Sequence, residues 1–464
     1  MANPHEIVHA QNGQLDILRT LDQCMGEDEL QCIVTRLHDG VLVFALVCRA
    51  FRDAVHRRQG AATNIQSTSA QVHCVLYASI LCTLPIMLCC LIVQAVTSVS
   101  RLRWALSMGC PHASICADAA AQGLTEVLVF ARGLDLPWGD TCASAARHGH
   151  LETLVYAHEH DCPWSETTCA SAAGGGYLEC LRYANEHGCA WDAATCANAA
   201  GCGHIDCLRF AHSHGCAWNE LTCECAAGGG QLESLMFAHE HGCAWNEATC
   251  GNAAAYGHMG CLRYAHESGC ELGVATCASA AAYGQLAALA YAYEHGCPWD
   301  DAACAKAAEG GHIDCLRYLR ERSCPWSEDA CKLAAGGGHV DCLRYLHDEG
   351  CPWGQETCVK AAEHGHITCL RYALEHGCPW WDELTACSFA ARNGHLICLQ
   401  YLHLQGCAWD EATCSEAAAN GHFDCLQFAH ENGCPWDDET VRQAKTRRQL
   451  ACLRYACDHG CPME

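Results

Sequence analysis

A repeat of 27 residues constrains this chain more than any other feature. A cysteine, followed in most copies by Pro-Trp or Ala-Trp, recurs at this spacing from Cys162 to Cys378 and again from Cys407 to Cys461. The interval is 26 residues before Cys162 and 29 residues across Trp380-Trp381. A fixed period of about 20 to 50 residues is typical of a solenoid, in which each unit packs on its neighbours.

Each copy has the pattern of two short helices. In the unit that starts at Asp192, Ala199 and Ala200 follow Cys196 by three and four residues, which is helical spacing rather than strand alternation. Gly203 separates the two helices, and Gly215 ends the second as a C-cap. Plausible N-cap residues open the first helix in several copies, namely Ser165, Asp192, Asn219 and Asn246. We therefore predict an all-α fold, a solenoid of about 13 helical-hairpin layers over residues 98–464.

The repeated string Thr-Cys-Ala-x-Ala-Ala-x-x-Gly-His-Leu-x-Cys-Leu-Arg-Tyr-Ala resembles the two-helix part of an ankyrin repeat. The resemblance covers about residues 98–464, and it implies stacked helical hairpins that bind other proteins. Each copy has 27 residues rather than the usual ~33, and Pro-Trp-Asp-Glu replaces most of the protruding β-hairpin. A Gly-His pair stands at the turn between the two helices in eight copies, in which the histidines are His150, His204, His258, His312, His339, His366, His395 and His422.

Charge argues against nucleic acid as a partner. The chain has 53 Asp and Glu against 27 Lys and Arg, a formal net charge of −26. Binding to a phosphate backbone relies on clustered Lys and Arg, because it is driven by counterion release. We expect protein partners instead.

Cysteine is abundant, with 44 copies in 464 residues. Equivalent cysteines of adjacent layers would lie about 8–10 Å apart, which exceeds the reach of a disulfide. A zinc site is suggested by His158-Glu-His160-Asp-Cys162, but paired Cys-x-x-Cys spacing is missing from the sequence. We therefore expect cysteine to act as a small buried hydrophobe in a reducing compartment, with no metal and no cofactor.

Tryptophan and arginine recur with the repeat. Twelve of the 13 Trp stand in the short connection between copies, where we expect them to pack between neighbouring layers. Glu271-Leu272 interrupts this series. Arginine of the Leu-Arg-Tyr motif is expected to pair with acidic residues of adjacent layers, at Arg182, Arg263, Arg317, Arg344 and Arg371.

Positions that vary between copies are the candidates for partner recognition. The two residues before the Gly of the helix turn differ from copy to copy, and in ankyrin-like repeats this position lines the partner-binding groove. Tyr256 and Tyr283 are the preferred anchors, because exposed aromatic residues dominate interface energetics. The predicted groove consists of Arg147, His148, Tyr256, Tyr283, Glu309, Glu363, His364, Arg392, Asn393 and Asn420. Drift at solvent-facing sites is the alternative explanation.

The N-terminal segment has a different pattern. Apolar residues at helical spacing predict a small helical module over residues 26–60. Its Leu46-Val-Cys-Arg-Ala-Phe-Arg-Asp-Ala-Val55 string resembles the end of an F-box, although the opening Leu-Pro is absent. An F-box docks on a Skp-type adaptor of a cullin ubiquitin ligase, so the resemblance implies adaptor binding by Leu30, Ile33, Leu37, Leu46 and Val47. The repeats would then select a substrate protein.

An apolar segment over residues 72–96 follows this module. No Asp, Glu, Lys or Arg occurs from Gln59 to Ser100, and residues 74–93 are almost wholly apolar. Twenty such residues can cross a hydrocarbon core of about 30 Å. Three alternatives stay open: a membrane span, a buried helix against the first layer, or a translated intron.

The sequence thus predicts a protein–protein interaction module, most concretely the substrate-recognition subunit of a cullin-type ubiquitin ligase. A scaffold without a ubiquitin role, with or without a membrane tether, is the alternative. We expect no enzymatic activity, because no phosphate-binding loop, metal-ligand set or nucleophile–base pair stands out. The start of the chain shows no signal-peptide pattern, so the expected location is the cytoplasm, with membrane anchoring as the alternative.

Overall fold

The computed structural model describes residues 97–107, 113–379 and 385–462. Within these ranges the chain forms 27 α-helices and no strand, which confirms the predicted all-α class. Helix α5 (Val99–Ser107) comes first, and thirteen helical hairpins follow it in the described part of the chain. The predicted number of layers is therefore confirmed.

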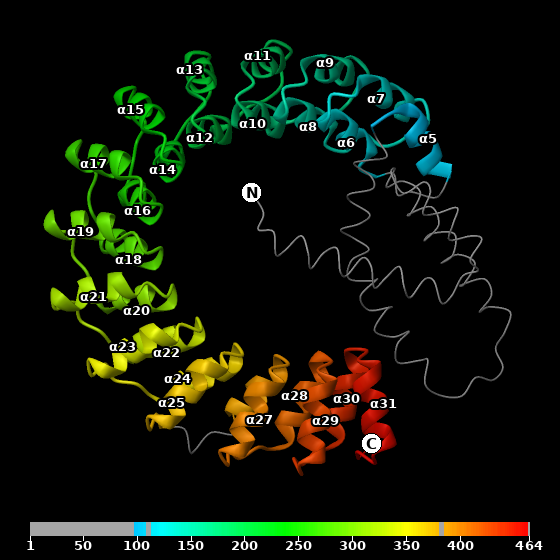
Figure 1. Ribbon diagram of the computed structural model, residues 1–464. Helices are drawn as coiled ribbons and strands as arrows, with labels where there is room; N and C mark the ends of the chain where they lie inside the picture. The colour runs from blue at the N-terminus through cyan, green and yellow to red at the C-terminus, as the bar shows by residue number, and fades with distance from the viewer. Residues whose placement is uncertain (1–96, 108–112, 380–384, 463–464) are drawn as a thin grey trace, which may run out of the picture. The chain divides into compact units, whose positions relative to one another are not determined.

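The hairpins pair an even-numbered first helix with an odd-numbered second helix (Figure 1). Their bounds are α6 (Ile115–Ala121) and α7 (Thr125–Arg132), α8 (Thr141–Arg147) and α9 (Leu151–Glu159), α10 (Glu166–Gly175) and α11 (Leu178–Glu186), α12 (Ala193–Gly201) and α13 (Ile205–Ser213), α14 (Glu220–Gly228) and α15 (Leu232–Glu240), α16 (Glu247–Ala255) and α17 (Met259–Glu267), α18 (Val274–Ala282) and α19 (Leu286–Glu294), α20 (Asp301–Glu309) and α21 (Ile313–Glu321), α22 (Glu328–Gly336) and α23 (Val340–Asp348), α24 (Gln355–Glu363) and α25 (Ile367–Glu375), α26 (Thr385–Arg392) and α27 (Leu396–Leu404), α28 (Glu411–Asn420) and α29 (Phe423–Glu431), α30 (Asp438–Thr446) and α31 (Leu450–Asp458).

The described residues fall into two compact units. One comprises the described part of residues 97–115 together with residues 126–137, where the guanidinium of Arg103 lies 5.2 Å from the ring centre of Phe130. The other comprises residues 116–125 and 138–462 of the described chain and contains α6 and the hairpins from α8 to α31. The packing described below belongs to this second unit.

Side-chain caps start several first helices, as predicted. Asp192, Asn219 and Asn246 accept hydrogen bonds from the backbone N–H groups of Ala194, Leu221 and Ala248, at 3.0, 3.2 and 3.0 Å. These bonds satisfy N–H groups that have no partner inside the helix. Ser165 stands at the N-cap position of α10, but its hydroxyl bonds to the Thr167 hydroxyl instead.

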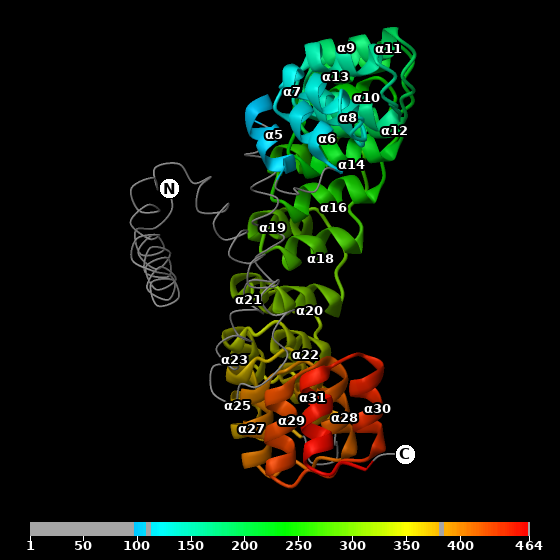
Figure 2. The same cartoon turned by 90° about the vertical axis from the view of Figure 1, so that its right-hand side faces the viewer.

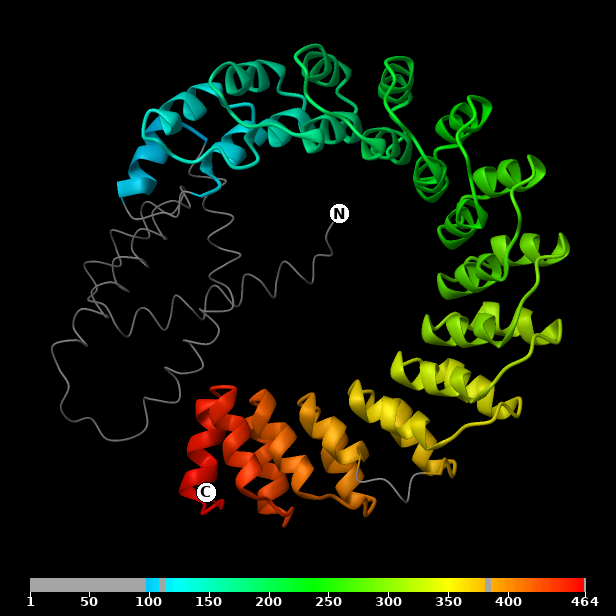
Figure 3. The ribbon, with the colours of Figure 1, turned by 180° about the vertical axis from the view of Figure 1, so that it is seen from behind.

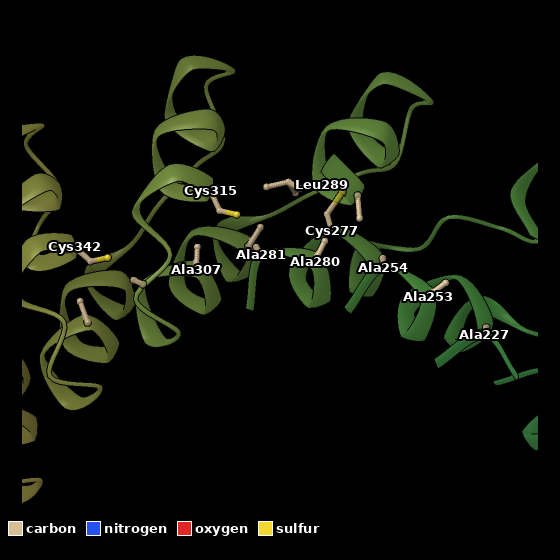
Figure 4. Close-up of a cluster of buried hydrophobic side chains, with 14 of the residues drawn as sticks. Ala227, Ala253, Ala254, Cys277, Ala280, Ala281, Leu289, Ala307, Cys315 and Cys342 are labelled. Atoms are coloured by element: carbon tan, nitrogen blue, oxygen red, sulfur yellow. The ribbon is translucent and has the colours of Figure 1, made fainter. Parts of the chain in front are cut away.

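Small side chains set how closely the first helices approach. Ala199 and Ala200 on α12 are fully buried, and alanine recurs at the equivalent places along the array. Figure 4 shows Ala254, Ala280 and Ala307 on three consecutive first helices, with Leu289 on the second-helix side. Because the second helices carry larger residues such as Leu and Tyr, they are spaced more widely than the first helices (Figures 1 and 3). A side view shows the hairpins following one another in chain order (Figure 2).

The predicted N-terminal features lie outside the described residues. This applies to the helical module at 26–60, to its residues Leu30, Ile33, Leu37, Leu46 and Val47, and to the apolar segment at 72–96. Among the residues that are described, none of the helices combines the length and the apolar character needed to cross a membrane.

Candidate functional site

The residues predicted to form a groove all lie at the C-terminal ends of first helices. The first helices lie on the opposite side of the array from the second helices (Figure 1), and we call the solvent-exposed surface that the first helices and their C-terminal ends form the inner face. Arg147, His148, Tyr256, Tyr283, Glu309, His364, Arg392 and Asn393 are exposed there, whereas Glu363 and Asn420 are half-buried. The inner face thus collects the residues that differ most from copy to copy.

Tyr256 and Tyr283 form a pair on this face. Their side chains are 54 % and 55 % exposed, and their ring centres lie 5.5 Å apart at an angle of 44°. The ring of Tyr256 also faces the preceding hairpin, because a Cβ atom at Gly228 would lie 3.7 Å from its Cε2. Two consecutive hairpins therefore present adjacent aromatic rings to solvent, and the first ring lies next to a glycine of the hairpin before it.

A charged stretch follows the tyrosine pair. All four lysines of the chain lie in first helices from α20 onwards, at Lys306, Lys332, Lys360 and Lys445. Lys306 pairs with Glu309 at 2.7 Å and Lys360 with Glu363 at 2.6 Å, each one turn apart on the same helix. A hydrogen bond from Lys332 to Asp329 raises the pKa of that lysine. Sequence reasoning missed these lysines, although the Lys-x-x-Glu spacing is visible in the sequence.

The remaining predicted groove residues bridge or cap the helices near them. Arg392 on α26 forms an ion pair of 3.6 Å with Glu416 on α28. Asn420 accepts a hydrogen bond of 3.1 Å from Arg447 of the next hairpin. Asn393 donates to the carbonyl of Phe389 in its own helix at 3.2 Å. The structure thus does not bring the ten residues together at one point but spreads them along the array.

Histidines of the Gly-His turn hold adjacent hairpins together. The ring Nε2 of His150 donates to the carbonyl of Ala121 in the preceding hairpin at 3.1 Å. Burial lowers the pKa of His366, although the bond of this ring to the Gly336 carbonyl acts in the opposite direction. Burial also lowers the pKa of His395, against the opposing effect of the bond between its ring and the Glu363 carbonyl. These rings are therefore part of the packing and do not line the inner face.

Tryptophan packs between layers, as predicted. Trp164 stacks on His158 of the preceding second helix, with ring centres 3.8 Å apart, and meets the edge of Tyr183 of its own hairpin at 6.2 Å. His158 Nδ1 and the Tyr183 hydroxyl are hydrogen-bonded at 2.9 Å. The same stack recurs in six other layers with histidine or tyrosine as the partner, at Trp218, Trp245, Trp299, Trp353, Trp409 and Trp436.

Leu272 occupies the place of tryptophan in one connection. The neighbouring His266 keeps its hydrogen bond to the Tyr291 hydroxyl at 3.1 Å. A hollow lies beside this position, lined by Trp245, Asn246, Glu247, Gly269, Cys270 and Glu271. The interruption seen in the sequence therefore leaves this connection without the indole that stacks on histidine in other layers.

The predicted pairing of the repeated arginines with acidic residues of adjacent layers is wrong for four of them. Arg182, Arg263, Arg317 and Arg344 lie over an aromatic ring of the next hairpin, at 5.8, 5.7, 5.9 and 5.8 Å from the ring centre. The acidic partners of Arg182 and Arg344 stand one turn away on their own helices, both at 3.8 Å. At the equivalent position of another copy, Arg209 lies over Phe237 at 4.5 Å and also pairs with Glu233 of the next hairpin at 3.8 Å, so the predicted interlayer ion pair does form there.

Comparisons with known proteins find a similarity to ankyrin repeats in part of the chain. A family model described as ankyrin repeats in many copies matches residues 358–403, which span α24 to α27. Among solved structures, the crystal structure of the human ASB11 ankyrin repeat domain is similar at 19 % sequence identity, with a TM-score of 0.31. That similarity covers 34 % of this chain and 84 % of the ASB11 chain. A search of curated proteins finds no match.

The matched residues support the resemblance that the repeated string suggested. In the described part of the chain, no group of three or more His, Cys, Asp or Glu side chains is placed to hold a metal ion. Ankyrin repeats indicate a protein–protein interaction module.

Proposed function

We propose that the hairpin array binds a partner protein along its inner face, with Tyr256 and Tyr283 as the central anchors. The observation that carries this proposal is the exposure of two aromatic rings side by side on a surface otherwise made of small residues and ion pairs. Burying exposed aromatic rings contributes strongly to protein–protein affinity, and such hot spots cluster near the centre of an interface. The charged first helices beyond them would then supply specificity at the rim.

The experiment compares three variants of the full chain. Proteins that copurify with the chain are identified, and the affinity of each purified candidate is then measured directly. We expect Tyr256→Ala and Tyr283→Ala each to weaken binding by about tenfold or more. The matched control is Leu404→Ala on α27, because Leu404 is 78 % exposed but lies on a second helix. Equal affinity of all three variants would contradict the proposal.

We further propose that the chain is a substrate-recognition subunit of a cullin-type ubiquitin ligase. The F-box-like string from Leu46 to Val55 supports this proposal, together with the apolar residues Leu30, Ile33 and Leu37 at helical spacing. In this arrangement residues 26–60 bind a Skp-type adaptor, and the array at 98–464 holds the substrate protein.

Capture on an immobilised Skp-type adaptor tests the ligase role. The full chain is expected to bind, and Leu46→Asp and Val47→Asp are expected to abolish binding, because a carboxylate would be buried in an apolar contact. Tyr283→Ala serves as the control that leaves adaptor binding intact. Failure of the unaltered chain to bind would leave a scaffold without a ubiquitin role.

Tethering to a membrane is a second candidate role, and the apolar run at residues 74–93 favours it. The chain would then sediment with membranes in a way that resists salt and alkali, because insertion of apolar area is insensitive to charge screening. Release by high salt would argue against an inserted segment.

A further inference from the structure

Eleven hairpins each contain two buried cysteines that are 20 residues apart. One stands near the start of the first helix, and the other follows the end of the second helix. The pairs are Cys142 and Cys162, Cys169 and Cys189, Cys196 and Cys216, Cys223 and Cys243, Cys250 and Cys270, Cys277 and Cys297, Cys304 and Cys324, Cys331 and Cys351, Cys358 and Cys378, Cys387 and Cys407, and Cys414 and Cys434.

In nine of the eleven pairs, the second thiol is hydrogen-bonded to a backbone carbonyl at the start of the first helix. Cys216 donates to the carbonyl of Asp192 at 3.2 Å, and Thr195, the residue before Cys196, donates its backbone N–H to the same carbonyl at 3.0 Å. The thiol of Cys216 therefore lies within one helical turn of Cys196. The equivalent thiol bond is 3.2 Å for Cys189, 3.2 Å for Cys243, 3.1 Å for Cys270 and 3.1 Å for Cys297.

The first thiol points back at the second cysteine. The sulfur of Cys169 lies 3.9 Å from the carbonyl oxygen of Cys189, and that of Cys142 lies 4.0 Å from the carbonyl oxygen of Cys162. The hydrogen bond with the Cys189 side chain, followed by burial, raises the pKa of the Cys169 thiol. Each thiol thus reaches the backbone next to the other cysteine of its pair, and both cysteines are shielded from solvent.

We propose that these pairs are sites of reversible disulfide formation, so that each hairpin from α8–α9 to α28–α29 can be closed by a bond between its two paired cysteines. The distance that argues against disulfides separates equivalent cysteines of adjacent layers, whereas the two cysteines of a pair belong to one hairpin. The proposal is independent of the partner-binding role proposed above.

The oxidant that the proposal requires is a low-molecular-weight disulfide such as oxidised glutathione. One thiol loses its proton to solvent and attacks a glutathione sulfur, which breaks the glutathione disulfide and releases one glutathione thiolate. The second thiolate of the pair then attacks the protein sulfur of the mixed disulfide and releases the other glutathione. Two electrons pass from the two cysteines to glutathione, and the two protons end on the two glutathione thiols.

Other cysteines of the same hairpins provide internal references. Cys207 is buried on α13, where burial and then Asp206 raise the pKa of its thiol to about 11, and it belongs to none of these pairs. Cys202 is exposed and lies outside the pairs as well. In the hairpin of α30 and α31 the first position is Val441, so Cys461 has no counterpart there. We expect these three cysteines to stay out of intrahairpin bonds.

The test equilibrates the reduced full chain in glutathione buffers of increasing oxidised fraction until the number of free thiols is constant. Free thiols are then alkylated, and disulfide-linked peptides are mapped by mass spectrometry. A second sample is refolded from urea in the same buffers, so that access to buried thiols cannot limit exchange. We expect bridges between residues 20 apart, with Cys207 alkylated in both samples.

Two variants sharpen the result. Cys196→Ala should leave Cys216 as a free thiol or a glutathione adduct, while the bridge between Cys223 and Cys243 still forms. Cys207→Ala removes a buried thiol of the same hairpin and should leave the bridge between Cys196 and Cys216 intact. Bridges between neighbouring hairpins, or paired cysteines that remain free in both samples, would overturn the proposal.

Discussion

Substitution of two glycines of one hairpin distinguishes the cost of a contact between layers from the cost of a strained backbone conformation. Gly338, between α22 and α23, and Gly350, after α23, have nearly equal φ angles of +79° and +78°. A Cβ atom at Gly338 would lie 2.5 Å from Nδ1 of His366 in the next hairpin, whereas a Cβ atom at Gly350 would meet nothing within 4 Å. Alanine at either position suffers the same left-handed strain, but only Gly338→Ala presses on the neighbouring layer.

The expected difference follows from these contacts. Left-handed alanine costs about 1–2 kcal/mol, which is the whole effect expected for Gly350→Ala. At Gly338 the ring of His366 must also move, which adds about 1–3 kcal/mol of overpacking. Loss of the ring's bond to the Gly336 carbonyl adds about 0.5–1.5 kcal/mol. Gly338→Ala is therefore expected to destabilise the array by about 2.5–6.5 kcal/mol in total.

The other hairpins of the chain show the same difference between the two glycine positions, because residues other than glycine occur mainly at the position after the second helix. Asp135, Asp161 and Ser323 have positive φ angles after second helices, at the position of Gly350. Between the two helices only Arg448 replaces glycine among the described hairpins, and it belongs to the last of them. Urea unfolding followed by circular dichroism, with hydrogen exchange in α22 and α24, measures both variants. Equal destabilisation by the two substitutions would refute the reasoning.

Three further predictions concern the packing. Leu272→Trp should raise stability by about 0.5–1.5 kcal/mol, because an indole at this position can stack on His266, as Trp245 stacks on His239; an unchanged or lower urea midpoint would argue against this. Leu262→Ala should cost about 2–5 kcal/mol because Leu262 is fully buried, whereas Leu404→Ala should change stability by less than about 0.5 kcal/mol; similar urea midpoints for the two would contradict the assigned core. Burial lowers the pKa of His366 and His395 in the folded chain, so as the pH falls these histidines take up protons in the unfolded chain before they do so in the folded chain. The contribution of the two neutral rings to the stability of the fold is therefore complete above about pH 6.5 and is lost as the pH falls through their lowered pKa values. A urea midpoint that is independent of pH between about 8 and 5 would contradict this sign.

Much of the fold could be predicted because the same local sequence pattern recurs in every copy of the repeat. The spacing of Ala199 and Ala200 from Cys196 identifies a helix, and Asp192 marks its start, since both depend only on neighbouring residues. The place of Tyr256 and Tyr283 was also predictable, because equivalent residues one repeat apart occupy equivalent places on stacked hairpins. Local patterns thus fixed both the helices and the inner face.

Contacts between different positions of the repeat could not be predicted in this way. The pairing of Cys196 with Cys216 depends on how the chain returns after the second helix, which helical spacing does not describe. The stacking of Arg263 over Tyr291 likewise depends on the offset between successive second helices. Formal charge favoured an acidic partner in the adjacent layer, but Arg182 and Arg344 find their acidic partners on their own helices and meet an aromatic ring of the next layer.

Photo-crosslinking of the full chain tests the central claim most directly. A photoreactive residue is placed at position 283 of the inner face in one sample and at position 404 of α27 in another, and crosslinked proteins are identified after irradiation in cells. The account predicts a discrete partner protein crosslinked from position 283 and not from position 404. The same partner captured equally from both positions, or only from position 404, would contradict binding along the inner face.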